Sequence, residues 1–297
     1  MSRRPAPGSA AAAAPAVRGG SSRLPSRLDR RNALFQQWQA LLTNRTKRSR
    51  AGEMIIQGVR PISQAIAHGI EIRALLTDGR EQPSQWAREL LHSSPAPVVV
   101  LAPELMAELG EREEGTPELL AIATLPADDL ERLLPERDDV LVVFDRPSGP
   151  GNIGSLARSV DALGGTGLLI TGHSADAWDP AAIRASTGSL FSMPVLRLPS
   201  HREVMAWIEE RRSQGEPWTV VGLDEAGGHQ LADTDLTGPT LLVVGNETIG
   251  MSAGWREACD VVAEIPMTGS ASSLNASVAG SIALYESRRQ RRAAVAG

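Results

Sequence analysis

The sequence predicts an α/β protein with two domains, because strand-like and helix-like segments alternate along its 297 residues in two successive series. A charged, proline-marked segment at 127–139 separates the two series and is the expected linker. The second series opens at 140–144 with an almost unbroken apolar run, which is typical of a buried parallel strand. Three loops rich in Gly and Asn then follow strand-like runs. In an open α/β sheet such loops lie at the carboxyl ends of the strands and form the ligand site.

Hydrophobic periodicity gives the expected order of elements. In the first half we expect a helix over 32–43, then strands at 54–56, 72–76, 98–101 and 120–124 alternating with helices at 61–68, 84–91 and 103–109. In the second half we expect strands at 140–144, 167–170, 195, 219–222, 241–244 and 261–265, and helices at 153–163, 203–212 and 276–289. Residues 1–30 show no periodicity and are predicted to be a disordered basic tail.

The charge of the chain is distributed unevenly. The formal net charge is -5, yet residues 1–60 hold twelve basic side chains and only two acidic ones, Asp29 and Glu53. A basic arm on an acidic body is the usual layout of a protein that contacts phosphate backbones. A solubilising tail is the alternative, but the basic run at 44–50 adjoins sequence that is expected to fold. The predicted RNA-binding residues are Arg45, Lys47, Arg48, Arg50 and Arg60.

Several classes of site and location are excluded by composition. One cysteine, Cys259, allows neither an intrachain disulfide nor a cysteine-cluster metal site. The five histidines form no i, i+4 pair, so no metal is expected. No stretch approaches the roughly 20 apolar residues of a membrane span, and prolines interrupt the alanine-rich start. We therefore expect a cytoplasmic protein with no membrane partner.

Residues 149–154 read Gly-Pro-Gly-Asn-Ile-Gly and satisfy the dinucleotide fingerprint between a strand and a helix. An NAD-dependent oxidoreductase is therefore an alternative. A dinucleotide-binding unit requires an acidic residue about 20 positions further on, where it holds the ribose. Here the second strand runs into Gly172 and His173 without a carboxylate, and the segment 145–148 is long for a tight turn. The sequence therefore favours a different ligand.

Taken together, the three loops resemble the signature motifs of the SpoU/TrmH family of RNA 2′-O-ribose methyltransferases, in the SPOUT superfamily. The first motif spans 150–164 and contains Asn152 and Arg158. The second, at 245–250, reads Gly-Asn-Glu-Thr-Ile-Gly. The third, at 265–277, contains Ile-Pro-Met and Ser-Leu-Asn. Their order and spacing agree with the family pattern over residues 140–287.

The resemblance implies a fold and a cofactor. Residues 140–297 are expected to form a SPOUT domain, in which the chain threads a deep trefoil knot around a mostly parallel sheet and binds S-adenosyl-L-methionine. Residues 31–126 are similar to the smaller L30e-like α/β domain, which binds the RNA substrate in this family. Relatives often carry Glu-Gly where this chain has Gln57-Gly58, so that position receives no role.

The resemblance also implies roles for individual residues. Arg158 matches the catalytic arginine, and Asn152, Ser273 and Asn275 match residues that order its surroundings or bind the ribose. At Gly245, we expect that a Cβ would push the purine away from the end of the strand. The cofactor-binding residues carried over from the family are Gly245, Asn246, Glu247, Gly250, Ile265, Met267, Ser273 and Leu274.

Further segments, at 35–42, 50–53, 58–63, 186–192 and 269–277, are similar to a resistance branch of the family that methylates a uridine ribose in 23S rRNA. We therefore expect 2′-O-methylation of a ribose in 23S rRNA, most simply of a uridine, by a homodimer formed through the knot domain. Resistance to a ribosome-targeting antibiotic such as avilamycin would follow. Housekeeping methylation of rRNA or tRNA is an alternative, as is a non-catalytic RNA-binding protein that kept the fold.

Overall fold

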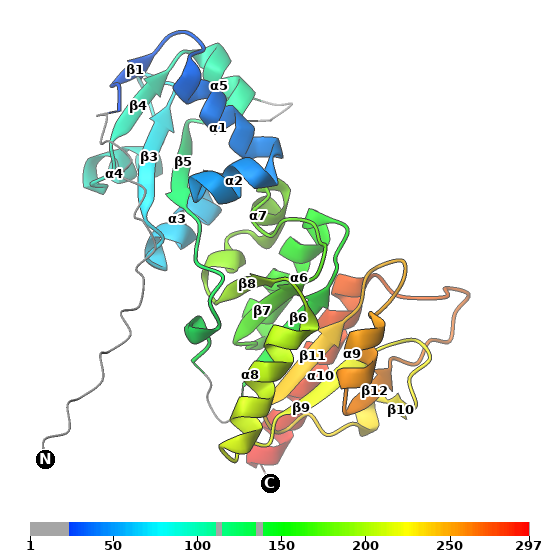
Figure 1. Ribbon diagram of the computed structural model, residues 1–297. Helices are drawn as coiled ribbons and strands as arrows, with labels where there is room; N and C mark the ends of the chain where they lie inside the picture. Colours follow the sequence, from blue (N-terminus) through cyan, green and yellow to red (C-terminus); the bar gives the residue numbers. More distant parts are fainter. Residues whose placement is uncertain (1–23, 111–114, 135–138, 297) are drawn as a thin grey trace, which may run out of the picture.

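The computed structural model describes residues 24–110, 115–134 and 139–296. Figure 1 shows two α/β units stacked one above the other, the upper one blue to green and the lower one green to red. Residues 1–23 of the predicted disordered tail lie outside the described residues. Within the described ranges, no helix is long and apolar enough to cross a membrane.

The upper unit contains a five-stranded mixed sheet in the order β1-β4-β3-β5-β2. Helices α1 and α5 cover one face, where Phe35 and Trp38 are buried. Helices α3 and α4 cover the other face, where Ile62 is buried. The strands are β1 (Arg27–Leu28), β2 (Glu53–Gln57), β3 (Ile72–Thr77), β4 (Val98–Leu101) and β5 (Leu119–Thr124), and the helices are α1 (Ala33–Thr43), α2 (Arg45–Ala51), α3 (Val59–Ala67), α4 (Gln85–Ser93) and α5 (Pro103–Gly110).

Side-chain caps set the starts of two of these helices. Asn32 Oδ1 accepts from the backbone N–H of Phe35 at 2.9 Å and begins α1. Ser84 Oγ accepts from the N–H of Ala87 at 3.1 Å, so Ser84 precedes α4 rather than belonging to it. These are the standard N-cap contacts. Helix α3 begins at Val59, two residues before the proline that the sequence placed at its start.

The predicted tail extended too far into the chain. Arg27–Leu28 form β1, which pairs in parallel with β4. Leu28 is buried in the same apolar cluster as Phe35. A strand of two residues has no measurable periodicity, so it could not be predicted from the sequence. The upper unit therefore begins before residue 31.

The basic run that follows α1 is a second short helix, α2. Asn44 ends α1, and its side chain accepts from the N–H of Lys47 at 2.9 Å to begin α2. Gly52 ends α2 in the left-handed conformation, with φ 66°, which glycine adopts at little cost. One residue thus joins two helices that point in different directions, and this decides which basic side chains face outward.

The lower unit contains a seven-stranded sheet in the order β10-β12-β9-β11-β6-β7-β8. Every strand pair in it is parallel, which confirms the predicted mostly parallel sheet. The strands are β6 (Val140–Asp145), β7 (Gly167–Thr171), β8 (Val195–Leu198), β9 (Thr219–Leu223), β10 (His229–Gln230), β11 (Thr240–Val244) and β12 (Val261–Glu264).

Helices cover both faces of this sheet and make three layers (Figure 1). Val142 and Phe144 of β6 pack with α6, α7 and α10 in one cluster, whereas Val143 packs with α8 and α9 in another. This split follows from the alternation of side chains along a strand. The helices are α6 (Pro150–Leu163), α7 (Pro180–Ser186), α8 (His201–Ser213), α9 (Ala253–Ala258) and α10 (Ala276–Ala296), with short 3-10 turns at Leu130–Arg132, Ser189–Phe191 and Leu231–Asp233.

Helices α7 and α9 were not expected from the sequence, because segments of seven and six residues are too short to show helical periodicity. The expected linker is partly structured: it contains the 3-10 turn Leu130–Arg132, and Arg132 Nη1 donates to Ala127 O at 2.6 Å. The threading of the C-terminal segment through a knot, which the family resemblance implies, stays a prediction.

Candidate functional site

The three Gly- and Asn-rich loops meet at one edge of the lower sheet. The first follows β6, the second β11 and the third β12. In the register of the sheet, Val244 at the end of β11 lies opposite Phe144 of β6 on one side and Leu223 of β9 on the other. Strand β12 is the next neighbour of β9. Parallel strands bring their carboxyl ends to the same edge, so the loops that the sequence singled out converge.

The second loop folds back on itself directly after β11. The backbone groups of Asn246 and Gly250 exchange two hydrogen bonds of 3.0 Å. Asn246 Oδ1 accepts from the N–H of Ile249 at 3.1 Å, and its Nδ2 donates to Arg146 O at 2.6 Å. A side chain of the second loop therefore holds it to the first.

The requirement for glycine at 245 has a different reason from the expected one. Gly245 is buried, and a Cβ there would lie 2.5 Å from the carbonyl carbon of Gly250 and would also collide with the backbone nitrogen of Met251. The glycine is needed because the loop passes over its own start. Contact with a purine is not required to explain it.

A carboxylate ties the second loop to the start of α6. Glu247 Oε1 accepts from Asn152 Nδ2 at 2.8 Å, and Oε2 accepts from the N–H and Oγ of Ser148 at 3.0 and 2.9 Å. Burial favours the protonated carboxyl, but the hydrogen bonds from Asn152 and Ser148 outweigh it and hold the pKa of Glu247 below its usual range. Glu247 is therefore an ionised acceptor at neutral pH and holds the second loop against the start of α6.

The third loop joins the same network through Asn275. Asn275 Oδ1 accepts from the N–H of Ser277 at 3.0 Å and begins α10, and its Nδ2 donates to Asn152 Oδ1 at 3.1 Å. Asn275 is thus both a helix cap and a link to α6. The chain Asn275–Asn152–Glu247 connects all three motifs by side-chain hydrogen bonds alone.

Between the second and third loops lies a cavity of about 470 Å³. This volume is in the range of small-molecule sites, about 300–1,000 Å³. All eight residues predicted to bind the cofactor line it: Gly245, Asn246, Glu247, Gly250, Ile265, Met267, Ser273 and Leu274. The glycine turn at 149–154, which carries the dinucleotide fingerprint, contributes no lining residue. Contact of the eight residues with a bound cofactor stays a prediction.

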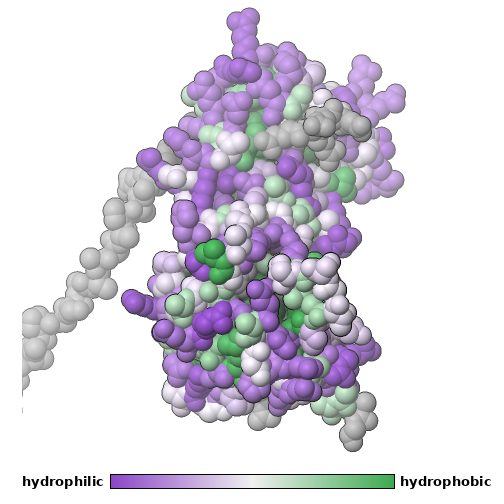
Figure 2. All heavy atoms as spheres, turned by 90° about the vertical axis from the view of Figure 1, so that its right-hand side faces the viewer, coloured by the Kyte–Doolittle hydropathy of each residue, from purple (hydrophilic) through white to green (hydrophobic). Residues whose placement is uncertain are grey.

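Apolar side chains at the cavity are unusually exposed. Ile249 is 66% exposed, and Met267 and Leu274 are each 37% exposed. Figure 2 faces the side toward which the loops project in Figure 1, and apolar patches lie among hydrophilic side chains on the lower unit. Exposed apolar contacts of this kind can cover a flat, weakly polar ligand group.

A fourth loop, after β9, also lines the cavity and was missed from the sequence. It contributes Asp224 and Glu225, and Arg256 of α9 lines the cavity beside them. Asp224 Oδ2 forms an ion pair with Arg256. Strand β9 was predicted, but the sequence did not reveal that β9 lies between β11 and β12. Once the strand order is known, Asp224 and Glu225 can be recognised as candidate site residues, because they directly follow a strand that ends at the cavity.

Arg158 lies on α6, exposed, and outside the lining of the cavity. Among the described residues no hydrogen bond or ion pair to its guanidinium is observed. One turn earlier, Gly154 packs tightly on α7, where an added Cβ would lie 2.7 Å from Ala185 Cβ. One turn later, Asp161 accepts from Ser189 Oγ at 2.7 Å. Arg158 is thus held on a rigid helix, free to bind an anion. Its predicted link to Ser273 or Asn275 is not made in this structure.

The predicted RNA-binding residues divide into two groups. Lys47, Arg50 and Arg60 are exposed and available to RNA. Arg45 is half-buried, and its Nη1 donates to Ser174 O at 2.8 Å. Arg48 corrects the sequence analysis: it is 1% exposed and bonded to Asp176 and Asp179 of the lower unit. A guanidinium in that position makes no contact with RNA, because it already has buried partners.

The two units and the cavity at the three loops define a class of protein. Residues 32–121 match the SpoU L30e-like domain, and residues 139–285 match the SpoU rRNA methylase family. Over 266 residues the chain is also 56% identical to a methyltransferase from Streptomyces viridochromogenes. This match covers 89% of this chain and 92% of that protein. The chain belongs to the SpoU rRNA methylase family.

That relative is named 23S rRNA (uridine(2479)-2′-O)-methyltransferase. The fold matches the crystal structure of the SpoU methyltransferase AviRb from S. viridochromogenes in complex with the cofactor AdoMet, with a TM-score of 0.86, 55% identity, and coverage of 88% of this chain and 99% of that one. An RNA 2′-O ribose methyltransferase matches with a TM-score of 0.74 and 30% identity, over 90% of this chain and 99% of that one. These matches confirm the predicted family and fold class.

Proposed function

We propose that the chain transfers a methyl group from S-adenosylmethionine to a ribose 2′-hydroxyl of 23S rRNA, and that the target nucleotide is a uridine. The observation that carries the proposal is the cavity lined by the second and third family motifs, in a chain 56% identical to a 23S rRNA uridine 2′-O-methyltransferase over 89% of its length. A ribosome-modifying enzyme of this kind acts in the cytoplasm.

The cavity suits S-adenosylmethionine in size and charge. It is about 470 Å³, and its lining includes the carboxylates Asp224, Glu225 and Glu247 against the single guanidinium of Arg256. An acidic lining favours a ligand that carries net positive charge. The backbone of 245–250 and the side chains of Ile265 and Leu274 would hold the adenosyl group. When bound, S-adenosylmethionine supplies the methyl group that the ribose oxygen accepts.

Arg158 is proposed to bind the phosphate of the target nucleotide and so position the 2′-oxygen. A guanidinium is effectively always protonated, which argues against a base role and favours an anion contact. Positioning of this kind contributes several kcal/mol to a displacement reaction, on the order of 7 or more where orientation is complete. Asn152, Ser273 and Asn275 would order the loops around it.

The proposal extends to a homodimer through α10. Val278, Ile282 and Tyr285 recur at helical spacing along α10 and are 46%, 36% and 61% exposed. An apolar stripe on one face of a helix is normally covered, and a second copy of the chain would cover it. Charged substitution of Ile282 should shift the sedimentation coefficient to that of a monomer. An unchanged dimer would place the contact elsewhere.

Tritiated methyl transfer to 23S rRNA tests the enzymatic proposal. Arg158→Ala should abolish transfer while binding of S-adenosylmethionine, measured by calorimetry, stays at the wild-type value. Arg202→Ala is the matched control, since Arg202 is exposed on α8, which covers the other face of the sheet from α6 and α10, and lies outside the cavity lining. Near-normal transfer by Arg158→Ala removes this residue from the mechanism. Binding of NAD in place of S-adenosylmethionine would instead favour the oxidoreductase alternative.

Resistance to a ribosome-targeting antibiotic such as avilamycin is proposed as the consequence. Growth of a sensitive host with and without the gene, in a series of antibiotic concentrations, tests it. Mapping of 2′-O-methyl sites on the rRNA of the same cells identifies the nucleotide. Equal sensitivity of the two strains, with a methylated site present, would indicate housekeeping methylation.

A further inference from the structure

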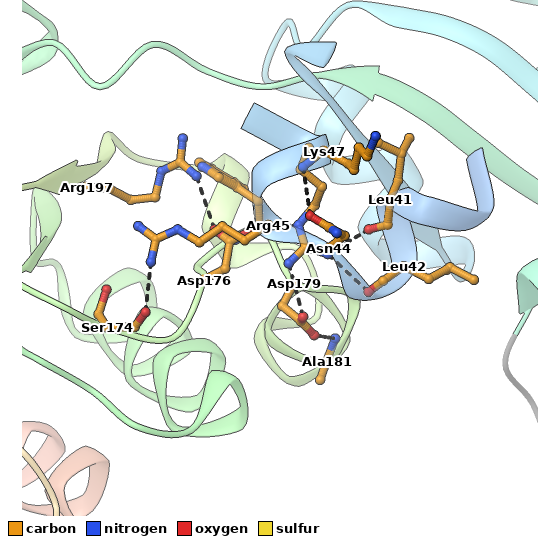
Figure 3. Close-up of polar contacts among 12 residues, drawn as sticks. Leu41, Leu42, Asn44, Arg45, Lys47, Ser174, Asp176, Asp179, Ala181 and Arg197 are labelled. Carbon is orange, nitrogen blue, oxygen red and sulfur yellow. Dashed lines mark hydrogen bonds and ion pairs between the residues drawn. The ribbon is translucent and has the colours of Figure 1, made fainter. Parts of the chain in front are cut away.

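The junction between the two units contains a chain of paired charges, buried at Arg48 and Asp176 and more exposed toward its ends. We call it the domain joint, and it consists of Arg48, Asp176, Asp179, Arg197 and Asp128. Arg48 comes from α2 of the upper unit. Its Nε lies 2.8 Å from Asp176 Oδ2, and its Nη2 lies 3.2 Å from Asp179 Oδ2. The Arg48 side chain is 2% exposed and that of Asp176 is 4% exposed. Figure 3 shows both aspartates on the lower unit, directed toward α2.

The remaining nitrogen of Arg48 is bonded within its own unit. Arg48 Nη1 donates to Leu41 O at 2.6 Å and to Leu42 O at 3.0 Å. These two carbonyls belong to the last turn of α1, where no intrahelical donor is available. All three nitrogens of the guanidinium therefore have partners, two of them across the junction. The planar geometry of the group makes these contacts directional.

The joint continues into the linker. Arg197 of β8 lies 3.2 Å from Asp176 Oδ1 and 2.9 Å from Asp128 Oδ2, and Asp128 is in the segment that connects the units. Burial alone would lower the pKa of Arg197, but Asp128 and Asp176 raise it above its usual value. Asp176 is thus shared between a guanidinium of the upper unit and one of the lower unit, and the linker is fixed to the same group.

Other contacts surround the joint. Arg45 Nη1 reaches Ser174 O at 2.8 Å, as Figure 3 shows. Arg184 Nη1 of the lower unit donates to Gln57 Oε1 of the upper unit at 3.0 Å. Gln57, which received no role from the sequence, thus makes a contact across the junction. An apolar cluster that includes Ile62 of α3 and Phe191 of the lower unit runs through the same region. The junction therefore contains apolar packing in addition to its ion pairs.

Buried charges with directional bonds fix the orientation of the two units more than they add to the stability of the junction. Removing one partner of a buried pair leaves an uncompensated charge and is costly, whereas a well-packed apolar contact of the same size can be equally stable. A rotation of the upper unit would separate Arg48 from Asp176 and Asp179 and leave its buried guanidinium without a carboxylate partner. An apolar junction alone would tolerate small rotations.

We propose that the domain joint holds the upper, L30e-like unit in one orientation relative to the cofactor cavity, and that Arg48 is a positioning residue for methyl transfer. This inference rests on the proposed function. The exposed residues Lys47 and Arg50 are carried on the same short helix as Arg48. Fixing α2 therefore fixes where RNA bound by this helix enters the cavity. The chain selects a folded RNA that spans both units at a set separation.

Arg48→Met tests the proposal, because it keeps an unbranched side chain about as long as the aliphatic stem of arginine and removes the bonds across the junction. Methyl transfer to a 23S rRNA fragment that contains the target should fall about 10- to 100-fold, since a displacement of about 1 Å has effects of this size. The affinity for S-adenosylmethionine should stay at the wild-type value. Small-angle scattering should show a wider range of molecular dimensions, which loss of stability alone would not produce below the unfolding temperature.

Arg88→Met is the matched control, because Arg88 is exposed on α4 of the same unit and no partner is observed for its side chain among the described residues. It should behave as wild type in all three measurements. Asp179→Asn is the second variant, in case Arg48→Met does not fold. Asp179 is 26% exposed and begins α7 through its contact with Ala181 N at 3.0 Å. Asparagine caps helices equally well, so only the ion pair is lost, and a smaller decrease in transfer is expected.

Wild-type scattering and wild-type transfer in folded Arg48→Met and Asp179→Asn would overturn the positioning role. That outcome leaves the proposed function intact, because the wild-type protein still transfers the methyl group. Failure of the wild type to methylate rRNA would instead overturn the proposed function. The scattering comparison would then still report whether the joint fixes the orientation of the units.

Discussion

Glu247→Gln is the sharpest single change at the cavity, since it keeps the shape of the side chain and alters its charge and its donor pattern. Asn275 Oδ1 accepts from the backbone of Ser277, so its Nδ2 donates to Asn152 Oδ1. Asn152 must then direct its Nδ2 toward residue 247. Ser148 donates to the same carboxylate from the other side. Glutamine can accept from only one of these two neighbours and directs an NH2 group at the other.

The expected size of the effect follows from the bonds that are lost. A hydrogen bond to a charged group contributes about 1.5–3 kcal/mol. Glu247 is only half-buried, so solvent screening places the loss at the low end of this range. About 1.4 kcal/mol corresponds to a tenfold change in an equilibrium constant. We therefore expect the Kd for S-adenosylmethionine to rise about tenfold as the second loop loosens.

Calorimetric titration near neutral pH measures this directly. Glu257→Gln is the matched control, because Glu257 is an exposed carboxylate on α9 outside the cavity lining. It should bind as wild type. If Glu247→Gln also binds within about twofold of wild type, a difference of only about 0.4 kcal/mol, the Asn275–Asn152–Glu247 network does not order the cavity and the reasoning is refuted.

The same network predicts a dependence on pH. The pKa of Glu247 is lowered in the folded protein, where Asn152 and Ser148 donate to the carboxylate against the opposing effect of burial. Its contribution is therefore complete above the ordinary carboxyl pKa of about 4.3 and is lost as the pH falls through the lower folded value. Cofactor binding should stay constant from neutral pH down to about 5. Glu247→Gln should remove the acidic decline that this group causes.

Three further changes have clear expectations. Gly154→Ala should destabilise the protein by about 1–3 kcal/mol through overpacking and lower the midpoint of thermal unfolding, because the new Cβ would meet Ala185 and the backbone of α7. Gly151→Ala on the same helix is the control: its Cβ meets nothing within 4 Å and should be neutral or stabilising. Equal midpoints for the two variants would show that α6 and α7 can separate freely. Cys259, whose pKa burial raises to about 12, should react with a thiol reagent at pH 8 only after unfolding, and fast labelling of the native protein would contradict its burial. Replacing the exposed Lys47 and Arg50 with alanine should weaken RNA binding and reduce the slope of log affinity against log salt by about 0.7–0.9 per lost phosphate contact; a gel-shift series in salt with an unchanged slope would exclude α2 from the RNA interface.

Deletion of residues 1–50 would not test RNA binding by the basic arm. It contains β1 and α1, and Phe35 and Trp38 within it are core residues of the upper unit. Removal of the whole segment would unfold the domain, so weakened binding would say nothing about charge. Removal of residues 1–23 takes away Arg3, Arg4, Arg18 and Arg23 and leaves the described fold intact.

Much of the candidate site could be predicted because its residues are local to their motifs. The residues from Gly245 to Gly250 follow directly after a strand, and so do Ile265 and Met267. Parallel strands end at one edge of a sheet, so residues that follow neighbouring strands are brought together. This is why eight residues chosen by motif line one cavity. Asp224 and Glu225 were missed because no motif marks them.

The sequence by itself determined the alternation of strands and helices, the parallel sheet and the glycine- and asparagine-rich loops, since these depend on periodicity and on residues close together in the chain. Tertiary structure alone decided the role of Arg48. A basic residue on a short helix looks like a surface charge, and its partners Asp176 and Asp179 lie 128 and 131 residues away. Tertiary structure also decided why position 245 needs glycine, because the obstruction is the loop's own backbone. Local patterns fix what a segment becomes, whereas burial and pairing depend on which distant segment packs against it.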